Sequence, residues 1–154
     1  AKKNIEWLEG SDTSKKYPIL PAVKLFVYDA THVSEKIESA SIDVIVTEPF
    51  MGPTHLGAND QYPISNIQLK NTIKGLEKLY IGCLKDWRIV LKPGGLVVMA
   101  LPKYTMQGRE YFVKKVIDTC ESLGYTVLRG PIEYSRPQAV VRREFFVLQK
   151  INPF

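Results

Sequence analysis

The sequence predicts an α/β protein built around a layered sheet. Short runs of apolar and β-branched residues alternate with segments in which apolar residues recur every three or four positions. These are the patterns of buried strands and of amphipathic helices. Two strand-like segments close the chain, and the connection between them is too short for a crossover helix, so we expect an antiparallel pair. With 154 residues, of which 45% are hydrophobic, the chain can form one domain with a sizeable core.

The first elements follow from residue type and turn signals. Residues 1–8 are typical of the end of a helix that lacks an N-cap, so we interpret the chain as part of a longer protein. Residues 24–29 are rich in β-formers and predict a short strand, and residues 34–39 predict one or two helical turns. The nearly continuous apolar run 42–47 predicts a central parallel strand that is covered on both faces.

The second half of the chain begins with a long loop over residues 48–65, which carries several prolines and glycines. A long amphipathic helix follows, and Pro93-Gly94-Gly95 is expected to end it. Its apolar stripe comprises Leu69, Ile73, Leu76, Tyr80, Leu84, Trp87 and Leu91. The remaining segments predict a buried strand at 96–101, a helix at 108–123, and closing strands at 125–134 and 144–149.

Composition narrows the class of protein without assigning a function. The net charge is +5 and the pI about 9.2, which is compatible with a polyanionic partner. No apolar run is long enough to span a bilayer, so no membrane partner is expected. Cys83 and Cys120 lie in helical patterns among apolar residues, which indicates buried thiols in a reducing compartment and hence a cytoplasmic location. We predict no metal site.

Residues that can carry chemistry lie directly after predicted strands. In open α/β sheets, ligands bind beyond the carboxyl ends of the strands. Tyr28-Asp29-Ala30-Thr31 places a carboxylate at one such end, and Thr47-Glu48-Pro49-Phe50-Met51-Gly52 follows the most apolar strand. The turn Leu91-Lys92-Pro93-Gly94-Gly95 precedes another strand and shapes the sheet.

The segment Asp43-Val44-Ile45-Val46-Thr47-Glu48-Pro49-Phe50-Met51-Gly52 resembles the "D-V-I-V-T-D-P-P-Y-G" element of amino-group methyltransferases. It is most similar to the RNA methylase family that includes the tRNA guanine-N2 enzymes. The "L-K-P-G-G" turn at residues 91–95 and the closing hairpin at 134–148 resemble that family in order and spacing. The resemblance covers nearly the whole chain. It implies a Rossmann-like class I methyltransferase sheet with a C-terminal antiparallel strand pair.

The resemblance also implies roles for particular residues. Glu48 and the carbonyl of Pro49 would accept the two N–H groups of an exocyclic amine and stabilise the charge that develops on it. Phe50 or Met51 would stack on the extruded base. The cofactor is expected to be S-adenosyl-L-methionine, bound by Asp29, Ala30 and Glu48.

The chain departs from the family pattern in the same element. Glu48 stands where the family has Asp or Asn, Phe50 replaces the second proline, and Met51 replaces an aromatic residue. No glycine-rich turn follows a strand before Asp29. Residues 1–154 are therefore interpreted as the C-terminal half of a catalytic domain truncated at its N-terminus, with the first two strands and the cofactor loop upstream of Ala1. Unpaired sheet edges would then favour a homodimer.

A nucleic acid, and tRNA in particular, is the expected partner. Arg136, Arg142 and Arg143, in or beside the closing hairpin, are candidates for contacts with its backbone. The four lysines of the long helix lie outside its apolar stripe and are interpreted as ordinary surface: Lys70, Lys74, Lys78 and Lys85.

Three functions remain open from the sequence. The first is methylation of guanine N2 in tRNA, and the second is methylation of adenine N6 or cytosine N4 in DNA. The third is a catalytically silent methyltransferase-like module that serves RNA binding or assembly.

Overall fold

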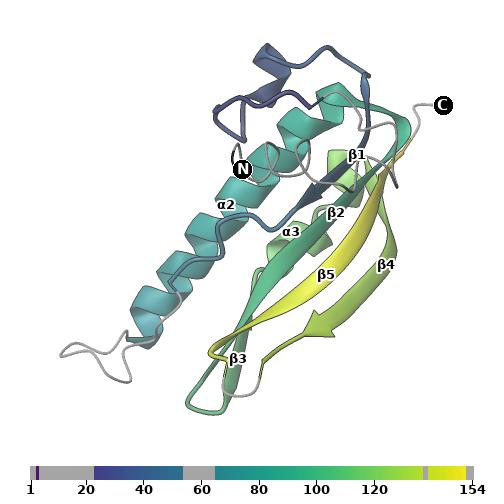
Figure 1. The fold of residues 1–154 in the computed structure, drawn as a ribbon. Coiled ribbons are helices and arrows are strands. Elements are labelled where there is room, and N and C mark those ends of the chain that lie inside the picture. Colours follow the sequence, from purple (N-terminus) through teal and green to yellow (C-terminus); the bar gives the residue numbers. More distant parts are fainter. Residues whose placement is uncertain (1–2, 4–22, 54–64, 137–138, 152–154) are drawn as a thin grey trace, which may run out of the picture.

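A twisted mixed sheet with helices packed against it forms the framework of the protein (Figure 1). The structure is a computed structural model that describes residues 3, 23–53, 65–136 and 139–151. Its strands are β1 (Ile42–Thr47), β2 (Leu91–Met106), β3 (Arg109–Phe112), β4 (Tyr125–Tyr134) and β5 (Val141–Lys150). The strand order is β1-β2-β5-β4, with β3 paired to β2. The predicted α/β sheet with a closing antiparallel pair is confirmed.

Strand β1 is more exposed than its sequence suggests. It pairs in parallel with β2, and among the described residues it has no second neighbour. Val44 is 46% exposed and Val46 is 75% exposed, so the prediction of a strand covered on both faces is wrong for the described part of the chain. A continuous β-branched run predicts a strand reliably, but the number of its neighbours depends on residues distant in the sequence.

Helix α2 (Asn66–Val90) begins with a capping box, in which Ser65 and Gln68 satisfy each other's backbone N–H groups. Its predicted apolar stripe is buried against the sheet from Leu69 to Trp87, whereas the last predicted member, Leu91, is the first residue of β2. The helix ends at Val90, just before Pro93-Gly94-Gly95, and β2 begins at once. The buried Tyr125 hydroxyl donates to the Leu84 carbonyl over 2.8 Å, which ties β4 to the same helix.

The segment predicted as a helix at 108–123 is shorter and begins with a strand. Residues 109–112 form β3, a hairpin partner of β2, and only Lys114–Asp118 are α-helical (α3), followed by a 3-10 turn, η3 (Glu121–Leu123). Gln107 and Gly108 both have positive φ, as a tight hairpin turn requires. Pairing with β2 decides the structure of this segment, and Phe112 also stacks on Phe146 of β5 with ring centroids 6.0 Å apart.

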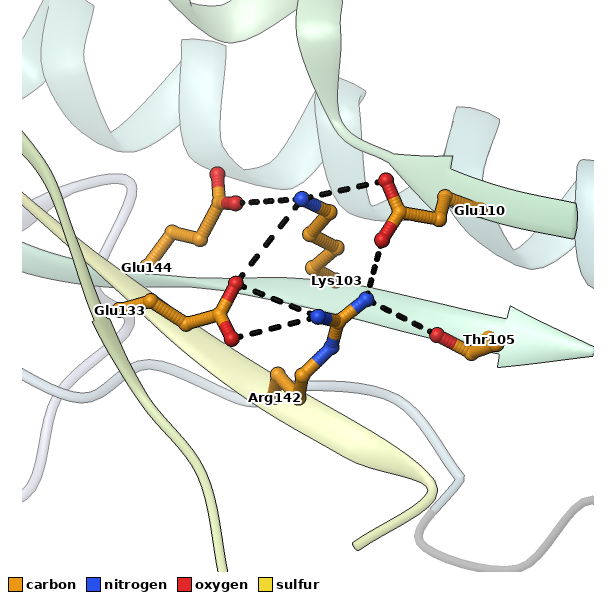
Figure 2. Close-up of polar contacts among 6 residues, drawn as sticks. All are labelled: Lys103, Thr105, Glu110, Glu133, Arg142 and Glu144. Atoms are coloured by element: carbon orange, nitrogen blue, oxygen red, sulfur yellow. Dashed lines mark hydrogen bonds and ion pairs between the residues drawn. The ribbon is translucent and has the colours of Figure 1, made fainter.

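A cluster of charged side chains joins β2, β3, β4 and β5 (Figure 2). The ammonium group of Lys103 lies 3.0 Å from the carboxylate of the buried Glu144 and 3.2 Å from Glu110. Arg142 pairs with Glu110 and with Glu133, and donates to the Thr105 hydroxyl over 3.0 Å. Hydrogen bonds from Arg142 and Lys103 hold the pKa of Glu110 below its usual range. The cluster therefore fixes both hairpins relative to each other.

Residues 24–29 do not form the predicted strand. They have no regular secondary structure, and Val27 is fully exposed. Their β-forming composition has no partner strand among the described residues, and an isolated strand is not stable alone. The only helical turn described in the predicted range 34–39 is η2 (Val33–Glu35), which is held to α2 because Asp86 accepts from the backbone and hydroxyl of Ser34.

Some predictions fall outside the described residues. They include nearly all of the helix predicted at 1–8 and most of the loop at 48–65.

The two cysteines are buried and unpaired, and burial raises the pKa of each thiol to about 11. None of the described helices combines the length and the apolar character that a membrane span needs.

Candidate functional site

A pocket lies where β1 ends and where the chain enters β5. Its volume is about 530 Å³. The residues after β1 form one wall, and the start of β5 and the residues before it form the other; the lining comprises Glu48, Pro49, Phe50, Met51, Gly52, Ala139, Val140, Val141 and Arg143. The four consecutive residues predicted to act in catalysis all line this pocket, and the structure adds the start of β5 opposite them. Phe50 is 70% exposed, which leaves its ring available to a flat ligand.

Two buried tyrosines hold the wall formed by residues 48–52. The hydroxyl of Tyr80, from α2, donates to the Phe50 carbonyl over 2.6 Å. The hydroxyl of Tyr104, from β2, donates to the Met51 carbonyl. Burial raises the pKa of Tyr104 to about 12 and that of Tyr80 further, so both hydroxyls stay protonated and act as donors. Among the described residues, nothing donates to the Pro49 carbonyl, which therefore stays available as an acceptor.

Gly52 is required by the same arrangement. It has φ +84, and a Cβ at this position would collide with the Tyr104 hydroxyl. Any side chain here would therefore combine an unfavourable backbone conformation with displacement of the tyrosine that holds the loop.

We expect Gly52→Ala to destabilise the protein by about 1–3 kcal/mol, because it adds left-handed strain and breaks the Tyr104 contact. Gly75→Ala is the matched control: Gly75 is exposed within α2, with open space around it. This control should stabilise the helix by about 0.5–1 kcal/mol. Urea unfolding of both variants measures the difference, and equal free energies of unfolding for Gly52→Ala and the parent would contradict the steric argument.

Glu48 is held by an arginine from the opposite wall. Its Oε1 lies 2.7 Å from both Nε and Nη2 of Arg143. Such charge-assisted bonds are short and directional. They engage one carboxylate oxygen of Glu48, and among the described residues no hydrogen bond engages the other, Oε2. The side chains of Glu48 and Arg143 are both partly exposed, at 46% and 34%, so a ligand in the pocket can reach them.

The three arginines predicted to contact nucleic acid have different surroundings. Arg143 pairs with Glu48, and Arg142 belongs to the charged cluster of Figure 2. Because successive residues of a strand point to opposite faces, these two arginines lie on opposite sides of the sheet. Arg136 is exposed, and its carbonyl accepts from the Ala139 backbone N–H over 3.0 Å. The fold therefore separates Arg142 from Arg143, although the sequence interpretation grouped them.

The predicted cofactor residues Asp29 and Ala30 do not line the pocket. Asp29 Oδ1 accepts from the backbone N–H and the hydroxyl of Thr31, both at 2.8 Å, and these bonds hold the pKa of its carboxyl below the usual range. The Ala30 carbonyl accepts from the Trp87 indole of α2 over 2.8 Å. These contacts fix the turn against the helix. The described residues contain no group of three or more side chains suited to a metal ion.

Sequence reasoning missed the roles of two residues that shape the site. The sequence placed Tyr80 only in the apolar stripe of the helix, although its hydroxyl needs a partner once buried. It named Arg143 only as a candidate contact with a nucleic-acid backbone and did not pair it with Glu48. A buried tyrosine signals a nearby acceptor in general, but the identity of that acceptor follows only from the fold.

The sequence itself matches no described protein family and no curated protein. The fold does match solved structures. A protein from Thermus thermophilus, provisionally named a DNA modification methylase, superposes with a TM-score of 0.55 and 18% identity. The match covers 86% of this chain and 56% of that one, and the same protein has been crystallised with S-adenosyl-L-methionine.

Two other structures show the same similarity. TrmN from Thermus thermophilus matches with a TM-score of 0.53 and 20% identity, over 98% of this chain and 34% of its own. PvuII DNA methyltransferase, which is cytosine-N4-specific, matches with a TM-score of 0.52 and 14% identity, over 81% and 48% of the two chains. The chain thus spans about half the length of these proteins or less. It has the mixed sheet of class I S-adenosylmethionine-dependent methyltransferases over part of those folds.

Proposed function

We propose that this chain is part of a methyltransferase that modifies an exocyclic amino group of a nucleic-acid base. The observation that carries the proposal is the pocket after β1, in which a carboxylate, a free backbone carbonyl and an exposed aromatic ring meet. The match to methyltransferase folds supports the same reaction class.

The pocket supplies the groups that an amine nucleophile needs. An exocyclic amine is a weak nucleophile because its lone pair is delocalised into the base. Oε2 of Glu48 and the carbonyl of Pro49 accept its two N–H bonds, which orients the nitrogen and stabilises the positive charge that develops on it. Phe50 stacks on the extruded base. Tyr80 and Tyr104 bind the next two carbonyls and so hold this backbone in place.

Arg143 positions the carboxylate of Glu48, which stands where the family has a shorter aspartate or asparagine. A glutamate carries its carboxylate about 1.5 Å further from the backbone than an aspartate, on bond-length grounds. The hydrogen bond from Nε and the ion pair with Nη2 of Arg143 hold one oxygen of that longer side chain, which restricts the positions that the other oxygen can take. Arg143 is in this proposal a positioning residue.

The residues that line the pocket fit the sulfonium group of S-adenosylmethionine. The carboxylate of Glu48 complements a sulfonium cation, and Met51 and Val141 provide apolar surface beside it. Asp29, expected to accept from the adenine amine, lies outside this pocket. When bound, S-adenosylmethionine supplies an activated methyl group.

Guanine N2 in tRNA is the substrate we propose, on the resemblance of residues 43–52 to the RNA methylases. The DNA amino groups are the second candidate, because two structural neighbours carry DNA methylase names. The test is to incubate the full-length protein with isotopically labelled S-adenosylmethionine and unmodified tRNA or DNA. Nucleoside mass spectrometry should find N2-methylguanosine. Labelled N6-methyladenine or N4-methylcytosine would transfer the assignment to DNA, and no label in any nucleoside would favour the silent module.

A further inference from the structure

A row of lysines runs along the surface of α2 and past α3. Lys70, Lys74 and Lys78 stand four residues apart, and Lys85 stands two turns further on. With a rise of about 1.5 Å per residue, the row is about 22 Å long. All four lysines are exposed. Like charges four residues apart on a helix repel each other, so the spacing of Lys70, Lys74 and Lys78 does not itself stabilise α2.

The row borders a groove between α2 and the segment from α3 to η3. The groove has a volume of about 570 Å³ and is lined by Lys78, Ile81, Gly82, Lys85, Lys115, Thr119, Ser122 and Leu123. Three lysines thus line one cavity whose described lining contains no carboxylate. Smaller neighbouring pockets continue the surface toward the start of α2 through Lys74 and Lys70.

These lysines differ from other cations of the chain, several of which each pair with a carboxylate: Lys92, Lys103, Lys114, Arg142 and Arg143. Among the described residues, no ion pair is formed by Lys78, Lys85 or Lys115. The neighbouring pockets contain Glu77 and Glu110. Glu77 accepts from the Lys115 backbone N–H over 3.0 Å, and Glu110 pairs with the charged cluster of Figure 2. The positive charge of the groove is therefore uncompensated within its described lining.

We propose that the groove between α2 and α3, with the lysine row beside it, binds the phosphate backbone of a nucleic acid. A line of ammonium groups about 22 Å long suits a polymer that carries a negative charge on every repeating unit. A membrane surface is a poorer match, because an interfacial helix needs an apolar face, and the apolar face of α2 is buried in the core. The surface is separate from the pocket at Glu48 and requires no methyl donor.

The test is tRNA binding by the full-length protein, measured by fluorescence anisotropy over a series of salt concentrations without S-adenosylmethionine. The variant Lys78→Gln/Lys85→Gln/Lys115→Gln should lose about tenfold or more in affinity at about 0.1 M salt. The slope of log K against log salt should become shallower by about two, since each phosphate contact contributes about 0.7–0.9. Its melting temperature should not fall, because the change relieves repulsion in α2.

The matched control is Lys24→Gln/Lys36→Gln/Lys92→Gln, which removes the same charge from exposed positions elsewhere. It should keep the parent slope. The proposal is overturned if the control loses as much affinity as the groove variant, or if the groove variant binds like the parent. Equal competition by polyglutamate at matched charge would overturn it too, by assigning the groove to an acidic protein. Failure of methylation with an intact difference in binding would count against the catalytic proposal alone.

Discussion

Glu48→Gln is expected to lower the rate of methyl transfer by about 100- to 1000-fold, with little change in the affinity for either substrate. The amide keeps the size of the side chain and one acceptor oxygen, but it removes the negative charge that faces a developing cation. An interaction that strengthens mainly in the transition state affects the turnover number rather than ground-state binding. Removal of one preorganised electrostatic contact typically slows a reaction by about 100- to 1000-fold.

The measurement is single-turnover methyl transfer to unmodified tRNA by the full-length protein. Asp43→Asn is the matched control, because Asp43 lies on the strand that leads to Glu48 and also pairs with a cation, Lys92, at 2.7 Å. Asp43 does not line the pocket, so its variant should retain the parent rate. If Glu48→Gln transfers methyl groups as fast as the parent, Glu48 is not the amine acceptor, and the silent-module interpretation gains support.

Arg143→Gln is expected to lower the turnover number by about 10- to 100-fold while the KM for nucleic acid stays within about twofold. Without the guanidinium, the Glu48 carboxylate is free to rotate, and a misplacement on the order of 1 Å costs about a hundredfold in rate. Arg143→Lys should recover little of this loss, because an ammonium group cannot reproduce the simultaneous contacts of Nε and Nη2 with Glu48.

The split between turnover number and KM distinguishes this role from a phosphate contact. If Arg143 contacted a backbone phosphate, Arg143→Gln would instead weaken binding and make the salt slope shallower by about one. Arg142→Gln serves as the control, because Arg142 is the neighbouring arginine on the other face of the sheet. This variant should lower stability through the charged cluster and leave the turnover number close to that of the parent.

Local patterns were sufficient for the elements whose stability is mostly local. The stripe of α2 and the apolar core of β2 follow from spacing and residue type, and the structure confirms them. The element after β1 was recognised by its resemblance to a family motif in combination with the surrounding elements, since such a strand end alone is often only a turn. The structure adds that Glu48, Pro49, Phe50 and Met51 line a pocket together with the start of β5.

The tertiary structure decided which segments pair and what each polar group contacts. Residues 24–29 have a strand-like composition but no described partner, whereas residues 109–112 form a strand because β2 extends beside them. Arg142 and Arg143 are neighbours in the sequence, yet one joins a charged cluster and the other holds Glu48. Spacing along the chain determines the face on which a side chain lies. Its partners come from segments far away in the sequence, so only the folded arrangement could reveal them.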